Sequence, residues 1–253
     1  MRDFHQNKDD NNLLDYIWDK ASQCDQKNIP THTNFLDLRQ QSLVASIQKQ
    51  FSVKHQFWGG YEDAERKLLV FLPEYLDSPE DPDLCLLEVS HHHPSPLTHR
   101  DYLGSVLALG IRRDKLGDIL VFEQGCQIIL LKELADFLLA NYHQAGRTPL
   151  ETQVKPLSEI ILPQQKTKLL TDTVASLRLD AVASSAFGIS RALAVKYIES
   201  GKTFVNNQEV CKPDKLLSPT DKITIRGYGK AVLKSISGTS KKGRLFIQLE
   251  VYL

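Results

Sequence analysis

The residues best suited to chemistry lie near the C-terminal end of the chain, where the pattern predicts that a helix begins at Ser190. The first amides of a helix have no partner within the helix, and the helix dipole makes that end favourable for an anion. Arg191 follows directly in the first turn, and its planar guanidinium can form two hydrogen bonds to a phosphate. These two residues predict that the chain captures phosphate groups rather than transforming a substrate.

Other cationic and polar side chains follow on elements that could line the same rim. Several cations on a rigid frame are what binding to an RNA backbone requires. Arg178 and Asp180 stand two residues apart at a predicted helix start and are expected to brace it. Arg178 is therefore assigned only partly to RNA, and Asp180 mainly to positioning. The predicted RNA-binding residues are Arg178, Ser190, Arg191, Lys196, Lys202, Asn206, Lys212, Arg226 and Lys230.

The formal charge of the 253-residue chain is zero, but the charge is unevenly distributed. Residues 173–253 contain 13 Lys or Arg and 6 Asp or Glu, whereas residues 1–172 contain 18 and 25. A basic C-terminal third on an acidic chain suggests that one end faces a polyanion. A solvated basic face would give the same count, so the charge alone does not decide between the two.

The composition limits the class of protein. No run of residues approaches the ~20 apolar residues that a membrane span needs. The polar, acidic stretch at residues 1–12 is unlike a secretory signal, so none is expected. The four cysteines have no CxxC pair, which fits neither a zinc site nor a disulfide framework and favours the cytoplasm. They are Cys24, Cys85, Cys126 and Cys211.

The C-terminal elements are predicted to be two short helices on a small curled sheet. Apolar residues at helical spacing predict the first helix over residues 179–186, and Gly188 ends it. Ser190 can cap the second helix by bonding to its early amides. Asn206 and the asparagine after it suit the positive φ of a tight hairpin turn. Strands are expected at residues 203–205, 222–226, 232–236 and 245–251.

Residues 53–160 are predicted to form a middle domain of strands with two interspersed helices, the order of a split β-α-β fold. Thr98 and Asp101 have the spacing of a capping box, which begins the first of these helices. The second helix lies around Leu134. The strands are expected at residues 67–72, 84–89, 118–122, 126–131 and 151–154.

Residues 1–52 contain two apolar runs at helical spacing, one from Leu13 to Ala21 and one from Leu36 to Phe51. Two amphipathic helices packed as a hairpin are the simple interpretation. The stretch 155–172 contains Pro156, Pro163 and a Gln/Lys cluster, and residues 161–172 within it are predicted to be a linker before the domain at 173–253. The expected fold class is therefore α+β.

Within the C-terminal domain, four motifs occur at a spacing that resembles the S-four RNA-binding domain, named after the fourth protein of the small ribosomal subunit. They are RLD from residue 178, GISR from residue 188, IESGKTFVNNQEV from residue 198 and DKITIRGYGK from residue 221. One departure is Thr220, where the family usually has glycine before the aspartate. The resemblance implies an S-four (αL) fold and a structured RNA as ligand.

Further motifs resemble the YlmH family of bacterial proteins. These are FLDLRQQ from residue 35, the segment HRDYLGSVLALGIRRDKLGDILV at residues 99–121, the helix around Leu134, and GRTP at residues 146–149. The resemblance implies an RRM-like middle domain joined to the S-four domain. It also implies a role in ribosome-associated quality control on the large subunit with a stalled peptidyl-tRNA. Cyanobacterial and plastid relatives carry a label that links them to photosystem two.

Three other patterns carry a possible chemistry. The three histidines at residues 91–93 suggest a metal site, but adjacent residues on an extended chain point to alternate sides, which favours a solvated loop. His-Arg-Asp at residues 99–101 imitates a kinase catalytic loop, but Val106 stands where that loop needs asparagine. Arg112, Arg113 and Lys115 form a basic loop, which is either a solvated turn or a secondary RNA contact.

These observations predict a non-catalytic RNA-binding protein that binds rRNA or tRNA on the ribosome, with no cofactor and no metal. An RNA-modifying enzyme is one alternative, since S-four domains also occur in pseudouridine synthases and rRNA methyltransferases. Residues 53–160 are short for a synthase domain and have no glycine-rich turn of a methyltransferase. An assembly or interaction protein linked to photosystem two is the other alternative. The sequence names no protein partner for the acidic N-terminal half.

Overall fold

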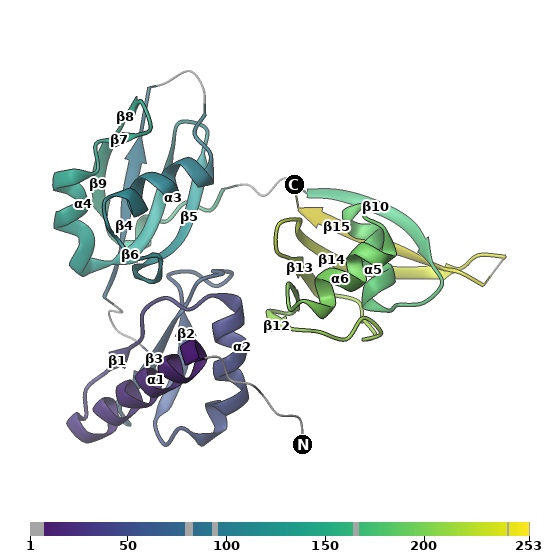
Figure 1. The fold of residues 1–253 in the computed structure, drawn as a ribbon, viewed down its shortest axis with the longest axis horizontal. Helices are drawn as coiled ribbons and strands as arrows, with labels where there is room; N and C mark the ends of the chain where they lie inside the picture. Colours follow the sequence, from purple (N-terminus) through teal and green to yellow (C-terminus); the bar gives the residue numbers. More distant parts are fainter. Residues whose placement is uncertain (1–7, 79–82, 93–95, 164–166, 242, 253) are drawn as a thin grey trace. The chain divides into compact units, whose positions relative to one another are not determined.

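The computed structural model describes residues 8–78, 83–92, 96–163, 167–241 and 243–252, and the chain folds into two compact units (Figure 1). Unit 1 is Met1–Pro163 and unit 2 is Gln164–Leu253. Both units combine helices with antiparallel sheets, which confirms the predicted α+β class. No helix in the described residues has the length and apolar character needed to cross a membrane.

The two helices predicted within residues 1–52 are present, but they pack on a three-stranded sheet, so their prediction as a helical hairpin is wrong. The strand order is β1-β3-β2, and two of these strands follow residue 52, so the predicted boundary there is wrong as well. Asp37 and Gln40 form the capping box that begins the second helix. The elements are α1 (Lys8–Lys27), β1 (Thr31–His32), α2 (Leu38–Ile47), β2 (Lys54–Trp58) and β3 (Leu68–Leu72).

Strand β3 is buried on both faces and joins the two parts of unit 1. Leu69 and Phe71 pack with apolar residues of α1 and α2. Leu68 and Val70 lie on the other face and pack with Phe35 and with strands of the neighbouring sheet. Successive side chains of a strand point to opposite faces, so a strand buried on both is a continuous apolar run, here LLVFL.

The rest of unit 1 is a four-stranded antiparallel sheet with the order β5-β6-β4-β9. Its chain order of strand, helix, strand, strand, helix, strand is that of a split β-α-β fold, as predicted. Tyr102 and Leu138 bury the two helices against one face. The first helix begins at the predicted capping box of Thr98 and Asp101. The elements are β4 (Leu84–Ser90), α3 (His99–Ala108), β5 (Leu116–Phe122), β6 (Gly125–Leu131), α4 (Ala135–Asn141), β7 (Gln144–Ala145), β8 (Thr148–Pro149) and β9 (Glu151–Lys155).

Unit 2 is a six-stranded antiparallel sheet with two short helices, in the order β10-β15-β14-β13-β11-β12. The linker predicted for residues 161–172 is wrong in its second half, because residues 167–172 belong to the edge strand β10. The strand was missed because it alternates apolar and polar residues only weakly and most of it is exposed. The elements are β10 (Thr167–Val174), α5 (Leu179–Phe187), α6 (Arg191–Glu199), β11 (Thr203–Val205), β12 (Gln208–Glu209), β13 (Lys222–Ile225), β14 (Gly229–Thr239) and β15 (Leu245–Tyr252).

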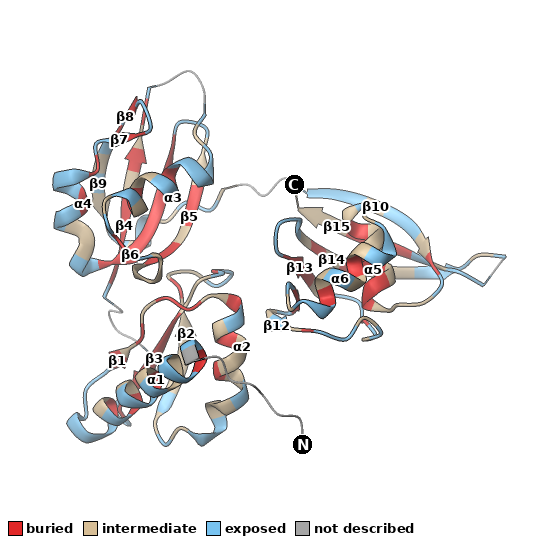
Figure 2. Ribbon diagram, in the orientation of Figure 1, coloured by how far each residue is buried: buried red, intermediate tan, exposed pale blue. Residues whose placement is uncertain are grey.

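The corner between α5 and α6 forms as the sequence predicts. Gly188 has a φ of 61°, a left-handed conformation that glycine adopts without strain, and it ends α5. Ser190 then caps α6, since its Oγ accepts a hydrogen bond from the amide of Leu193 at 3.2 Å. Figure 2 marks buried positions on α5 and along the strands, where the apolar core of unit 2 lies.

We expect a fragment of residues 164–253 to fold alone, because the buried apolar residues of unit 2 form one cluster within it. A fragment of residues 175–253 should be less stable, since it lacks β10, which pairs along its full length with β15 and buries Val174. Thermal unfolding followed by circular dichroism compares the two fragments. An unfolded 164–253 fragment would contradict the division into two units.

Candidate nucleic-acid interface

Unit 2 holds a buried carboxylate between two arginines. Asp180 lies in the first turn of α5, and its side chain is only 3% exposed. Arg178 donates from Nε and Nη2 to the two carboxylate oxygens at 3.1 Å each. Arg191, in the first turn of α6, donates from Nε at 3.1 Å and from Nη2 at 3.0 Å to Oδ2. We call Arg178 and Arg191 the arginine pair.

The arginine pair keeps the Asp180 carboxylate ionised. Burial alone would raise the pKa of Asp180, because a charge is poorly solvated in the interior. The hydrogen bonds and positive charges of Arg178 and Arg191 outweigh burial and hold this pKa below its usual value. The arginine side chains themselves are 38% and 54% exposed. The three groups therefore form a fixed surface with one net positive charge.

The arginine pair lies beside the start of α6. Ser190 satisfies the amide of Leu193, and the other amides of the first turn favour an anion, as at any helix N-terminus. Each guanidinium has five N–H donors, and Asp180 accepts two from each. An anion at this point would thus meet a guanidinium whose orientation is already fixed.

A second group of predicted residues surrounds the turn between β13 and β14. The amide of Arg226 donates to the carbonyl of Lys202 at 2.9 Å, which brings the two residues together. The Arg226 guanidinium lies 5.3 Å from the ring centre of the buried Phe204. Lys230 follows the turn and pairs with Thr224 in the ladder. Lys202 and Arg226 are therefore neighbours, and Lys230 follows the same turn.

Lys196 lies on α6 and, with Lys202, lines a hollow of about 200 Å³. Lys196 therefore belongs with this second group and not with the arginine pair. Tyr228 lies in the turn between β13 and β14, and the sequence patterns assigned it no role. The glycines on both sides of it are a signal for an exposed turn.

Asn206 and Lys212 have different surroundings. Asn206 and Asn207 have positive φ, as predicted for the hairpin turn. The Asn206 side chain donates to Asp221 at 2.7 Å and accepts from the amide of Lys222 at 2.9 Å, so both its polar ends stabilise that turn. Lys212 begins a loop that packs against the start of α5, where the amide of Asp180 donates to the carbonyl of Pro213 at 3.0 Å.

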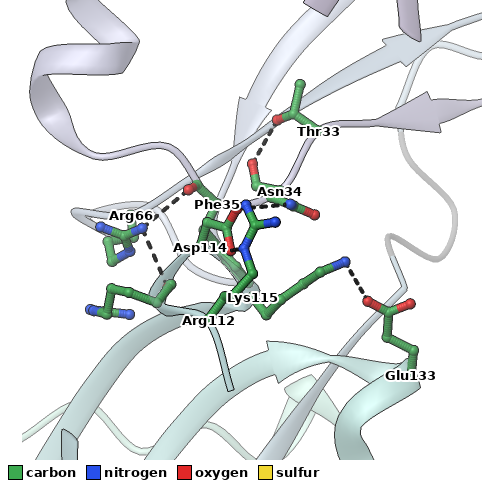
Figure 3. A network of polar contacts seen from close by, with 9 residues as sticks. Thr33, Asn34, Phe35, Arg66, Arg112, Asp114, Lys115 and Glu133 are labelled. Carbon is green, nitrogen blue, oxygen red and sulfur yellow. Dashed lines mark hydrogen bonds and ion pairs between the residues drawn. The ribbon is translucent and has the colours of Figure 1, made fainter. Parts of the chain in front are cut away.

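The basic loop predicted as a secondary RNA contact makes ion pairs and hydrogen bonds within unit 1 (Figure 3). Arg112 donates from Nε to Asp114 at 3.1 Å and from Nη2 at 2.5 Å. Asp114 also accepts from the Asn34 side chain at 3.0 Å, which ties the loop to the N-terminal part of the unit. Lys115 forms a 2.6 Å ion pair with Glu133.

Arg113 of this loop satisfies the backbone at an irregularity in β5. The ladder between β5 and β6 shifts register between Leu116 and Ile119, and such a shift leaves carbonyl groups without ladder partners. Arg113 Nη1 donates to the carbonyls of Leu116 at 2.7 Å and Gly117 at 3.0 Å. Burial, and then the neighbouring Arg66, lowers the pKa of Arg113 to about 10, which leaves it protonated at neutral pH.

The predicted absence of a metal site rests on the histidines at residues 91–93, of which His93 lies outside the described residues. Among the residues that the structure describes, no group of three His, Cys, Asp or Glu side chains is placed to hold a metal ion.

Comparisons with known proteins agree with the YlmH-like motifs. Residues 78–159 match the family model YlmH_RBD, described as "Putative RNA-binding domain in YlmH". The "Ribosome-associated protein quality control protein P2" of Bacillus subtilis (strain 168) is 34% identical over 221 residues, which are 86% of this chain and 86% of the relative. The solved "Cell division protein ylmH from Streptococcus pneumoniae" has a TM-score of 0.54 and 22% identity, and the match covers 64% of this chain and 99% of that one. The last likeness concerns the fold alone.

The fold and the site define a two-unit α+β protein in which a buried carboxylate holds an arginine pair beside a helix N-terminus. The extent and identity of the Bacillus match show that the chain belongs to the YlmH family.

We expect Asp180→Asn to lower the free energy of unfolding at neutral pH by about 1 to 3 kcal/mol, the range for hydrogen bonds to charged groups. The folded-state pKa of Asp180 lies below the ordinary value of 3.8, so the stabilisation is complete above that value and is lost as the pH falls through the folded-state pKa. Urea unfolding of both proteins between about pH 6 and about pH 3 should therefore show a difference that shrinks in acid. A difference that stays constant across this range would contradict the ionised form.

We expect Arg113→Ala to destabilise unit 1 by about 1 to 3 kcal/mol, because the Gly117 carbonyl loses the Arg113 donor and the Leu116 carbonyl keeps only the one from Arg66. Arg112→Ala is the matched control and should cost about 0 to 1 kcal/mol, since its partner interaction is a surface ion pair. Chemical denaturation of the two variants compares them at equal change of charge. Equal losses would show that Arg113 does not stabilise the bulge in β5.

Proposed function

We propose that this protein binds structured RNA without catalysing a reaction, and that its RNA is rRNA or tRNA on the ribosome. The description of the family model that matches residues 78–159 supports RNA binding. The name of the Bacillus relative, a ribosome-associated quality control protein, supports the ribosome as the place of action. The motifs of unit 2 support an S-four module as the principal RNA-binding element.

The observation that carries this proposal is the arginine pair held by Asp180. Free arginine side chains lose rotational freedom when they bind, and this loss weakens association. Arg178 and Arg191 have already lost it in the folded protein, because Asp180 fixes each with two hydrogen bonds. A guanidinium with a fixed orientation suits the bidentate recognition of phosphate.

A structured RNA fits this surface better than a flexible strand. The two guanidiniums are fixed at the starts of two helices that meet at a rigid corner, so their separation does not adapt to the ligand. A folded RNA presents its phosphates at equally fixed positions, and shape and backbone contacts dominate the recognition of paired RNA. Lys202, Arg226 and Lys230 in the second group would add further phosphate contacts.

We expect Arg191→Ala to weaken RNA binding by about 1 to 3 kcal/mol, the size of a charge-assisted hydrogen bond. Arg191→Lys should recover part of the loss, because lysine restores the charge but not the planar fork. Removing one phosphate contact should also flatten the plot of log affinity against log salt by about one unit. Fluorescence anisotropy with an rRNA hairpin and with a tRNA, at several salt concentrations, measures both quantities.

Lys168→Ala is the control within unit 2, since Lys168 is exposed on β10, at the opposite edge of the sheet from β11 and β12. This variant should change neither the affinity nor the salt slope. The proposal is wrong if Arg191→Ala and a Lys202→Ala/Lys230→Ala double variant both bind as the wild type does.

A further inference from the structure

Three aromatic rings form a partly exposed cluster on unit 2, apart from the arginine pair. The rings of Tyr197 and Tyr228 meet edge to face, with centroids 5.2 Å apart. The centre of the Phe187 ring lies 6.5 Å from that of Tyr228. Tyr228 is 39% exposed, while Phe187 and Tyr197 are half-buried. We call Phe187, Tyr197 and Tyr228 the aromatic platform.

The backbone holds Tyr228 at the tip of a tight turn. Its amide donates to the carbonyl of Ile225 at 3.0 Å, which closes the turn between β13 and β14. Gly227 and Gly229 on either side have φ values of 89° and 108°, which other residues rarely adopt. The turn is therefore built from residues that allow an aromatic side chain to stand on the surface at a fixed place.

The aromatic platform and the arginine pair occupy different sides of α6. Tyr197 is six residues after Arg191, which places the two side chains about 120° apart around the helix axis and about 9 Å apart along it. The buried Ala194 and Ile198 lie between them and face the core. A ligand on the arginine pair therefore leaves the platform open to a neighbouring part of the same molecule.

Cations surround the platform. Lys202 Nζ lies 5.5 Å from the centre of the Tyr197 ring, within the range of a cation–π interaction. The hollow of about 200 Å³ beside this ring is lined by Leu193, Lys196, Tyr197, Ser200 and Lys202. These described lining residues include two lysines and no acidic side chain, so they favour a ligand with negative charge. The Tyr197 ring favours a ligand that is flat and has apolar faces.

We propose that the aromatic platform stacks an unpaired base of the RNA whose phosphates lie on the arginine pair, an inference that rests on the proposed function. Every base has a flat π face, so stacking on tyrosine needs no particular sequence. Bases within a duplex are already stacked on each other, and only bulges, loops and ends offer one to a protein. Lys196 and Lys202 are then placed for the phosphates that flank that base. The substrate class is a helical RNA with a bulged or terminal unpaired nucleotide.

The test uses the full-length protein and two blunt-ended RNA hairpins, each closed by a non-nucleotide linker in place of a loop, that differ only by one bulged nucleotide, which is 2-aminopurine. Binding should quench the fluorescence of this base as it stacks. Tyr228→Leu removes the ring but keeps an apolar side chain on the turn, and it should weaken binding of the bulged hairpin by about 5- to 150-fold, the range for one stacked base. The same variant should bind the fully paired hairpin as the wild type does. Tyr228→Phe keeps the ring and should bind both hairpins normally.

Arg191→Ala separates this inference from the proposed function, because it should weaken both hairpins equally. If Arg191→Ala weakens both while Tyr228→Leu weakens neither, the platform does not stack a base and the proposed function stands. A loss in Tyr228→Leu that is equal for the two hairpins also overturns the stacking, since it shows contact with the backbone. If the wild type binds neither hairpin, or if Arg191→Ala and Tyr228→Leu both bind as the wild type does, the proposed function and the platform fail together. Circular dichroism of each variant confirms that it is folded.

Discussion

The C-terminal unit depends on one buried charge. A carboxylate that is 3% exposed would lose its proton only at a large cost in free energy if it had no partners. Asp180 has two, at the starts of different helices, so the meeting of α5 and α6 at the observed corner stabilises its ionised state. The amides of Leu179 and Asp180 meanwhile bond to the loop at residues 213–215. The Asp180 side chain thereby connects both helices and sets the orientation of two guanidiniums, while the backbone beside it holds the loop.

The helix pair could be predicted from local signals, whereas the edge of the sheet could not. Gly188 and Ser190 are local signals, since each acts on the backbone within a few residues of itself. Strand β10 owes its structure to pairing with β15, about 80 residues later, and its own residues are mostly polar or exposed. The two-residue strand β1 is similar, because Thr31 pairs with Phe71 across the whole of α2 and β2. Long-range pairing of this kind leaves little trace in a local pattern.

The contacts of the candidate site likewise divide into local ones, which spacing along the chain can indicate, and long-range ones, which it cannot. The spacing of Arg178 and Asp180 predicted that they brace one helix start, and there they bond to each other. The contact between Asp180 and Arg191 spans 11 residues and follows from the corner between two helices, which spacing does not specify. Arg113 looked equally available in the sequence. Its guanidinium is instead used by carbonyls that a register shift in β5 leaves without ladder partners, and sequence periodicity does not reveal such a shift.

The uneven charge of the chain gains a structural meaning from these contacts. In unit 1 the basic loop is matched by acidic partners, with Arg112 on Asp114 and Lys115 on Glu133. In unit 2 the arginine pair shares one carboxylate, so positive charge is left over at the start of α6. A count of charges cannot distinguish cations that stabilise a fold from cations that remain for a ligand. Their partners do, and by this measure one unit of the excess in residues 173–253 remains where a helix N-terminus already favours an anion.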